Sequence, residues 1–226
     1  MAKGKAEAPW SQAGAPDVKV LPEADVEAGE KVVWFVRHAE SENNVSKRLA
    51  MRALRARTWP SWEEWKKISP MLLFPMDTPL SADGRGQASR QAAALQAARF
   101  VESQRIQLVV HSHLQRARET CLTLFASSGV PIEEHAHLYE KSLSEHCGQH
   151  VGCASTMKPR VDGFVAWLRG RRETEILLVG HSGFFRCMFR PERGVDNAAV
   201  WRAVMTTAPD GTPAFRGVME VYPGLA

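Results

Sequence analysis

The stretch VVWFVRH at residues 32–38 decides the fold. It is a short run of β-branched and aromatic residues that ends directly in charged ones, and this pattern is typical of a strand buried on both faces. Two later stretches have the same character, IQLVVHSH at 106–113 and EILLVG at 175–180. The sequence therefore predicts three buried strands, each with polar residues at its carboxyl end.

Helical patterns lie between and after these strands. A helix is predicted over residues 80–103, where Ser81 can cap the helix and apolar residues recur at helical spacing. Further helices are predicted at 114–127, at 160–170 and directly after the strand at 175–180. Two extended runs at 199–207 and 214–222 are separated by PDGTP, which favours a hairpin. We therefore expect an α/β fold, with a mostly parallel central sheet, helices on both faces and an antiparallel edge hairpin near the C-terminus.

The composition indicates one globular domain. The chain has 226 residues, of which 44% are hydrophobic and 24% charged, close to the globular average. Residues 1–31 have no periodicity and are predicted to be a flexible extension, with a single domain over 32–226. We expect no membrane span, no membrane partner and no secretory signal, hence a cytoplasmic protein whose four cysteines are thiols.

Positive charge is concentrated in one segment. The chain carries a net +4, yet residues 45–76 contain seven basic and two acidic side chains, a net +5. Because the rest of the chain is about neutral, we expect no nucleic-acid partner but a local patch that attracts anions.

This segment, 45–76, is predicted to be a helical insertion, and two interpretations remain open. Trp59, Trp62 and Trp65 recur every three residues, so they could form a helical stripe that packs on the core. Alternatively, the insertion also presents a basic face to the pocket and selects an acidic substrate. The residues of that face are Arg48, Arg52 and Arg55, at positions i, i+4 and i+7.

The predicted strand ends carry related chemistry. The first ends in Arg37 and His38, the second is followed by Arg116, and the third by His181. In open α/β sheets ligands lie beyond the carboxyl ends of the strands. Guanidinium groups bind tetrahedral dianions through charge-assisted hydrogen bonds, and imidazole can act as a nucleophile near neutral pH. The pattern predicts a phosphate pocket.

Four motifs in order resemble the histidine phosphatase superfamily, the phosphoglycerate-mutase-like branch 1. They are RHAESENN at 37–44, DTPLSADGRGQA at 77–88, SHLQRARET at 112–120 and LLVGHSGFFR at 177–186. The sequence departs from the family pattern at Ala39, where glycine is commoner, but the residue remains small.

The resemblance implies a mechanism. His38 would be the nucleophile that forms a phosphohistidine, and the phosphoryl oxygens would be surrounded by Arg37, Arg116 and His181. The same motifs imply Asn44, Ser41 and Ser182 as further substrate-binding residues. The resemblance implies a small phosphorylated substrate and no metal or cofactor. The sequence leaves the oligomeric state open.

The resemblance also implies a carboxyl group as the proton donor, and two candidates remain. Glu140 stands in a Leu-x-Glu setting like that of the family, and Glu145 follows five residues later. The family places a glycine four residues after the acid, whereas Gly148 lies eight after the first candidate and three after the second. We favour Glu140.

Cys147, His150 and Cys153, with His146 adjacent, are zinc-ligand types, but no second ligand pair with customary spacing accompanies them. A hydrolase is favoured over a phosphoglycerate-mutase-type phosphotransferase, because residues 45–76 do not reproduce the Trp-rich continuation of the family mutases. A non-catalytic module that binds a phospho-ligand or a partner is disfavoured, because it would not need the nucleophile His38.

Overall fold

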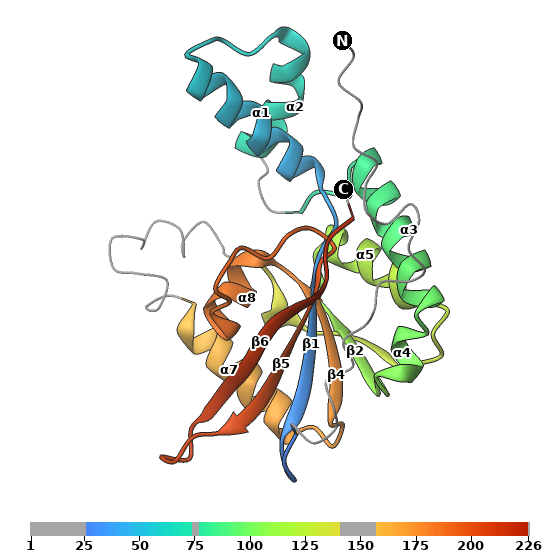
Figure 1. The fold of residues 1–226 in the computed structure, drawn as a ribbon. Coiled ribbons are helices and arrows are strands. Elements are labelled where there is room, and N and C mark those ends of the chain that lie inside the picture. The colour runs from blue at the N-terminus through green and yellow to red at the C-terminus, as the bar shows by residue number, and fades with distance from the viewer. Residues whose placement is uncertain (1–25, 74–76, 141–156, 226) are drawn as a thin grey trace, which may run out of the picture.

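The computed structural model describes residues 26–73, 77–140 and 157–225, with the side chains of 70–73 left aside. Its centre is a six-stranded sheet of order β3-β2-β4-β1-β5-β6 (Figure 1). The strands are β1 (Lys31–Arg37), β2 (Leu108–His111), β3 (Ile132–Glu134), β4 (Glu175–Gly180), β5 (Val200–Thr207) and β6 (Pro213–Tyr222). The pairs β1–β4, β2–β4 and β2–β3 are parallel, whereas β5 runs antiparallel to both β1 and β6. The predicted mostly parallel sheet with a C-terminal antiparallel hairpin is confirmed.

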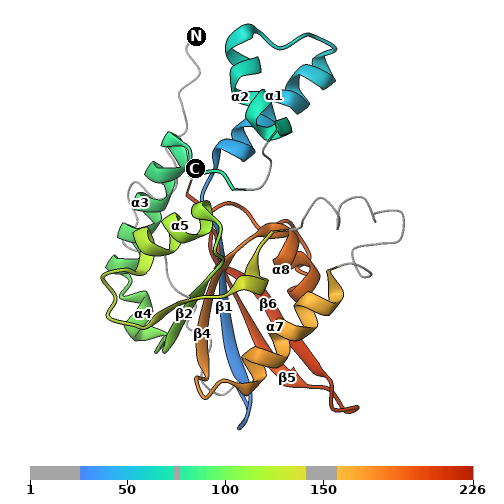
Figure 2. The ribbon, with the colours of Figure 1, turned by 180° about the vertical axis from the view of Figure 1, so that it is seen from behind.

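Helices cover both faces of this sheet (Figures 1 and 2). One face packs on α3 (Ala82–Ala97), α4 (Phe100–Ser103) and α5 (Gln115–Phe125), and the other on α7 (Lys158–Gly170) and α8 (Ser182–Phe189). Residues of β1 alternate between these faces, since Phe35 packs with the α7 and α8 side chains and Trp34 packs with the α3, α4 and α5 side chains. The β1 stretch is therefore buried on both faces, as its composition predicts.

The elements differ from the sequence prediction in three places. The helix expected over 80–103 breaks into α3 and α4, because Arg99 adopts a left-handed backbone with φ of 46°. The second strand is shorter than the predicted run, and β3 was not predicted, since it is a three-residue edge strand that is half-buried or exposed.

The residues just before β1 lie against the domain. Val26 is half-buried and packs on the core, and Glu30 forms an ion pair with Arg216 of β6. The described part of the predicted extension, residues 26–31, is therefore held in place, and β1 itself begins at Lys31. The division into an extension and one domain stays a prediction.

The insertion forms a hairpin of two helices, α1 (Glu42–Ala56) and α2 (Trp62–Leu73), which rises from the end of β1 (Figure 1). The expected tryptophan stripe on the core is wrong for two of its three members, since only Trp65 of the three is half-buried. Trp59 precedes α2 and is 88% exposed, and Trp62 is 73% exposed. The reason is local, because α1 ends at Arg57 in a left-handed conformation and the chain then turns through Pro60.

Two further sequence expectations concern membrane spans and cysteines. Among the described residues, no helix combines the length and apolar character needed to cross a bilayer. Cys121 is a buried free thiol, as predicted, and Cys187 is half-buried, whereas Cys147 and Cys153 lie outside the described residues.

Candidate active site

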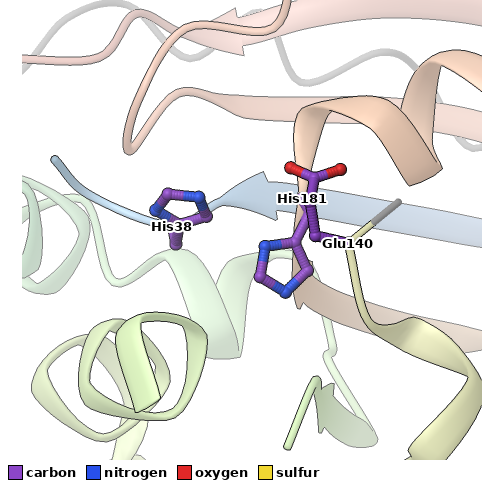
Figure 3. Close-up of side chains that lie close together, drawn as sticks. All are labelled: His38, Glu140 and His181. Atoms are coloured by element: carbon purple, nitrogen blue, oxygen red, sulfur yellow. The ribbon is translucent and has the colours of Figure 1, made fainter. Parts of the chain in front are cut away.

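Three of the predicted site residues meet at the carboxyl end of the sheet (Figure 3). His38 follows β1, His181 follows β4, and Glu140 follows the short 3-10 helix η2 (Ala136–Leu138). One ligand atom from each side chain lies within 4.8 Å of those of the other two. The histidines come together because β1 and β4 are neighbouring parallel strands, with Arg37 directly opposite Gly180.

The ring of His38 is held in one orientation. It is 2% exposed, and its Nδ1 donates a hydrogen bond to the carbonyl oxygen of Ala39 over 2.7 Å. A carbonyl oxygen can only accept, so the proton of the neutral ring is on Nδ1 and the lone pair is on Nε2. Nε2 is therefore the nitrogen available for attack.

Two side chains hold the backbone of this loop. Asn197 donates from Nδ2 to the carbonyl oxygen of His38 over 2.7 Å, and Thr120 accepts at Oγ1 from the backbone N–H of Ala39 over 3.0 Å. Neither residue is among the site residues predicted from the sequence. Thr120 lies within the quoted stretch 112–120, whereas no motif marks Asn197.

Both histidines are neutral at neutral pH. Burial lowers the pKa of His38 well below its ordinary value, and the guanidiniums of Arg116 and Arg37 lower it further. Burial likewise lowers the pKa of His181, and His38 and Arg116 add to that effect. A lowered pKa keeps the nucleophilic lone pair unprotonated below pH 6.5, where an ordinary histidine would gain a proton.

The two predicted arginines are held in the same site. Arg116 lies in the first turn of α5 and is 3% exposed, and Arg37 donates from Nη1 to the carbonyl oxygen of Val195 over 2.9 Å. Burial lowers both arginine pKa values, while the Glu140 carboxylate raises them, so this carboxylate is close enough to act on both. Both guanidiniums remain charged, because an arginine keeps its proton in proteins.

His181 is oriented by a hydroxyl group. Its Nε2 lies 2.9 Å from Oγ of Ser112, a buried residue just after β2. Among the described residues, its buried Nδ1 has no hydrogen-bond partner, and neither has Nε of Arg37. Buried polar atoms are normally satisfied, so two such atoms in one site indicate a place for a polar ligand.

The position of Glu140 is set by α7. Arg160 of that helix donates hydrogen bonds to the carbonyl oxygens of His137 and Tyr139, over 2.7 and 2.8 Å. Its guanidinium also lies 3.7 Å from the centre of the Tyr139 ring. The backbone leading into Glu140 is thereby fixed on the domain. The alternative acid Glu145 lies outside the described residues, as do His146, Cys147, His150 and Cys153, so these two alternatives stay predictions.

Three smaller candidates lie nearby. Ser41 caps α1, and its hydroxyl and backbone N–H both donate to Oδ1 of Asn44, over 3.0 and 3.1 Å. This capping box occupies the Asn44 oxygen and the Ser41 hydroxyl, so the amide nitrogen of Asn44 is the donor of this pair that is left for a ligand. Ser182 is the half-buried first residue of α8. Their roles in substrate binding stay predictions.

The three arginines of the insertion are all exposed, and they lie at different distances along the axis of α1. Arg48 pairs with Glu40, which follows the His38 loop, whereas Arg52 pairs with Glu64 of α2. Arg55 lies about 20 Å along the helix from Glu42, because a helix rises about 1.5 Å per residue. Arg48 is therefore the member nearest the site, and substrate binding by this set stays a prediction.

The site contains side chains that can bind a metal ion and side chains that can bind an anion. Two imidazoles and a carboxylate, from His38, His181 and Glu140, could hold a metal ion. The buried guanidinium of Arg116 and the half-buried one of Arg37 raise the energy of a divalent cation at this place and lower that of a dianion. The charge balance therefore favours an oxyanion such as phosphate.

The comparison with known families agrees with this chemistry. A model of the histidine phosphatase superfamily (branch 1) matches residues 63–156. The resemblance to this superfamily is confirmed. The matched range contains Arg116 and Glu140 but neither His38 nor His181, so the assignment of the two histidines depends on their motifs and on the geometry above. No curated protein sequence matches the chain.

Solved structures of superfamily-like proteins share the fold. The mycobacterial glucosyl-3-phosphoglycerate phosphatase is 15% identical, with a TM-score of 0.55, and the match covers 86% of this chain and 100% of that one. The same mycobacterial enzyme in complex with VO3 matches with a TM-score of 0.55 and 18% identity, over 86% and 100% of the two chains. YhfR of Bacillus stearothermophilus is 18% identical, with a TM-score of 0.51, and the match covers 82% of this chain and 95% of that one. At these identities the likeness shows the fold, which is phosphoglycerate-mutase-like.

One glycine packs the superfamily-like motif at 77–88 against the His38 loop. A Cβ at Gly84 of α3 would lie 1.8 Å from the carbonyl oxygen of Glu40, two residues after His38. We expect Gly84→Ala to lower the free energy of unfolding by about 3 kcal/mol, the upper part of the range for overpacking, and to lower kcat by displacing the His38 loop. Urea unfolding and steady-state kinetics measure the two effects.

The matched control lies half a turn further along the same helix. A Cβ at Gly86 would meet only Nη1 of Arg90, at 3.2 Å, which is the end of a flexible side chain. Gly86→Ala should therefore be neutral or stabilise the protein by up to about 1 kcal/mol through helix propensity. Equal destabilisation by the two substitutions would contradict the close packing at Gly84.

Proposed function

We propose that this chain is a phosphatase that hydrolyses phosphomonoesters through a phosphohistidine on His38. The observation that supports the proposal most directly is the oriented, neutral Nε2 of His38 in a site with the guanidiniums of Arg37 and Arg116 and the Glu140 carboxyl group. This arrangement combines a nucleophile, an anion-binding pocket and a proton donor, which are the three requirements for ester cleavage at phosphorus.

In the first step, the phosphoryl oxygens bind Arg37, Arg116 and Nδ1 of His181, which has no other partner among the described residues. Nε2 of His38 attacks phosphorus, the P–N bond forms and the P–O bond to the alcohol breaks. The proton on Glu140 moves to the departing alkoxide, so the alcohol leaves neutral and the carboxylate remains.

The second step returns the site to its starting state. The Glu140 carboxylate takes a proton from a water molecule, whose oxygen attacks phosphorus as the P–N bond breaks. Inorganic phosphate leaves, Nε2 of His38 recovers its lone pair, and Glu140 is protonated again. Each charge-assisted hydrogen bond to the transferring group contributes about 1.5–3 kcal/mol, and it lowers the barrier only to the extent that it is stronger in the transition state.

Positive charge for this reaction comes from the chain itself. Arg37 and Arg116 remain charged in the buried site and would stabilise the phosphoryl oxygens in the way a metal ion does elsewhere. We therefore propose that turnover needs no metal. Hydrolysis of a panel of phosphomonoesters, with and without a chelator, tests the activity and identifies the substrate class.

The insertion would bind the part of the substrate that does not react. We expect the triple substitution of Arg48, Arg52 and Arg55 by Gln to raise KM for a doubly anionic substrate about tenfold at low salt, because three exposed charges each contribute up to about 1 kcal/mol. The KM of a simple monophosphate ester should change little. The penalty should shrink as salt is added, because a Debye length of about 10 Å at 0.1 M screens such charges.

A second triple variant controls for the change in net charge. Arg90, Arg169 and Arg172 are exposed arginines outside the insertion, and their replacement by Gln should leave both KM values unchanged. If the insertion variant affects both substrate types equally, or neither, Arg48, Arg52 and Arg55 have no part in substrate selection.

A further inference from the structure

Large apolar side chains are exposed together on the α1–α2 hairpin. Trp59 is 88% exposed, Trp62 73%, Leu54 71% and Met51 48%, and the last two lie one helical turn apart on α1. Elsewhere in the described residues, large exposed hydrophobic side chains are confined to Leu122 and Met219, at 42% and 39%. Clustered exposed apolar groups usually mark a binding surface, whereas single ones do not.

The same part of the hairpin is basic. Residues 43–62 contain five basic side chains and no acidic one. Arg55 and Arg57 are exposed close to Trp59 in the sequence, whereas Arg52 is paired with Glu64 of α2. We call Leu54, Arg55, Arg57, Trp59 and Trp62 the hairpin tip.

The hairpin tip is also the part that an extended surface would meet first. In both views the turn between α1 and α2 lies at the end of the hairpin that points away from the sheet (Figures 1 and 2). Trp59 lies in this turn and Trp62 begins α2, so a flat partner could reach both without contact with the sheet domain.

We propose that the hairpin tip docks the protein on the surface of an anionic lipid bilayer. Tryptophan side chains favour the interface between headgroups and acyl chains, and arginines near them are attracted to anionic headgroups. The tip consists of a few exposed side chains around one turn, which suits insertion into a fluid interface better than the larger complementary contact that a stable protein complex needs. The sequence expectation of no membrane partner rests on the lack of a membrane span, whereas peripheral docking requires none.

The test is cosedimentation of the full chain with lipid vesicles. We expect binding to phosphatidylcholine vesicles that contain phosphatidylserine, and much weaker binding to phosphatidylcholine alone or at high salt. Replacement of Trp59 and Trp62 by Ser should lower the partition coefficient at least about tenfold. Replacement of Arg55 and Arg57 by Gln should lower it about 25-fold, since each arginine near an anionic surface contributes about a factor of five.

The matched control changes exposed apolar residues elsewhere. Replacement of Leu122 and Met219 by Ser should leave vesicle binding unchanged, because these side chains lie outside the hairpin. Brominated lipid should quench tryptophan fluorescence in the wild type, and the quenching should be lost in the variant without Trp59 and Trp62. Turnover of a water-soluble ester should be the same in that variant as in the wild type, which shows that it is folded and separates docking from the proposed phosphatase activity.

Three results would overturn the proposal. The first is no cosedimentation of the wild type with anionic vesicles, and the second is equal binding by the wild type and the variant without Trp59 and Trp62. The third is self-association of the wild type in gel filtration that this variant lacks, without vesicle binding, which would assign the hairpin tip to contact with a second copy of the chain.

Discussion

Replacement of His38 by Asn is expected to lower kcat for any phosphomonoester by at least about 10⁴-fold, because it removes the attacking atom rather than one of several stabilising groups. The Asn amide can donate to the Ala39 carbonyl in place of Nδ1, so the loop keeps its hydrogen bond. Wild-type protein quenched during turnover should carry acid-labile phosphate, and the variant should carry none.

A second buried histidine is the matched control for this substitution. His111 ends β2, is 6% exposed, and donates from Nδ1 to the carbonyl of Ser112 over 2.8 Å, the same local geometry as at His38. His111→Asn should cost less than about tenfold in kcat, since no step of the proposed reaction uses this ring. Full activity in the His38 variant would overturn the proposed mechanism.

A chelator separates the metal-independent mechanism from a metal centre. Turnover of the wild type should be unchanged in chelator, because the two guanidiniums supply the positive charge. Loss of turnover that zinc restores would instead assign a metal role, either to the group His38, Glu140 and His181 or to Cys147, His150 and Cys153.

The central sheet could be predicted from sequence because its strands carry their own signal. Both faces of β1 and β4 are buried, so their residues are apolar almost without interruption and end abruptly in polar ones. The strand β3 carries no such signal, since Ile132–Glu134 is short, lies at a sheet edge and includes two glutamates. The break between α3 and α4 occurs because Arg99 has a left-handed backbone conformation. Arginine rarely adopts this conformation, so the residue type does not predict it.

The tryptophans of the insertion show the limit of periodicity. A spacing of three over seven residues fits a helix, but the same spacing arises here from one residue in a turn, Trp59, and two in α2. Burial could not be inferred from residue type either, because the hairpin extends away from the core that would have covered Trp59 and Trp62. Amphipathic spacing predicts which side chains share a face but not what lies against that face.

The side chains proposed to react were predicted more readily than the groups that hold them. His38, Arg37 and His181 adjoin strands and lie in motifs, so chain topology alone brings them together. Asn197, Ser112 and Arg160 act through hydrogen bonds to backbone carbonyls or a ring nitrogen, and the positions of these partners follow from the tertiary structure. Such supporting residues are found from coordinates rather than from residue type.

Glu140→Gln is expected to slow hydrolysis of an alkyl phosphate about 10²–10⁴-fold, the usual contribution of a positioned general acid. An alkoxide is a strongly basic leaving group and needs the proton, whereas a nitrophenolate leaves readily without it. The same variant should therefore lose much less of its rate of phosphohistidine formation with 4-nitrophenyl phosphate. Rapid-quench measurement of that first step isolates the effect, because water activation in the second step also uses Glu140.

Glu145→Gln is the decisive comparison, since it tests the other carboxyl group that the sequence offers. It should leave the ratio of alkyl to aryl rates unchanged, because Glu140 is the carboxylate that lies within 4.8 Å of both histidines and acts on both site arginines. If the ratio of alkyl to aryl rates falls in the Glu145 variant and not in the Glu140 variant, the assignment of the proton donor is reversed. Replacement of Arg160 by Lys should give a weaker form of the Glu140 effect, because a lysine cannot hold the carbonyls of His137 and Tyr139 together in the same planar geometry.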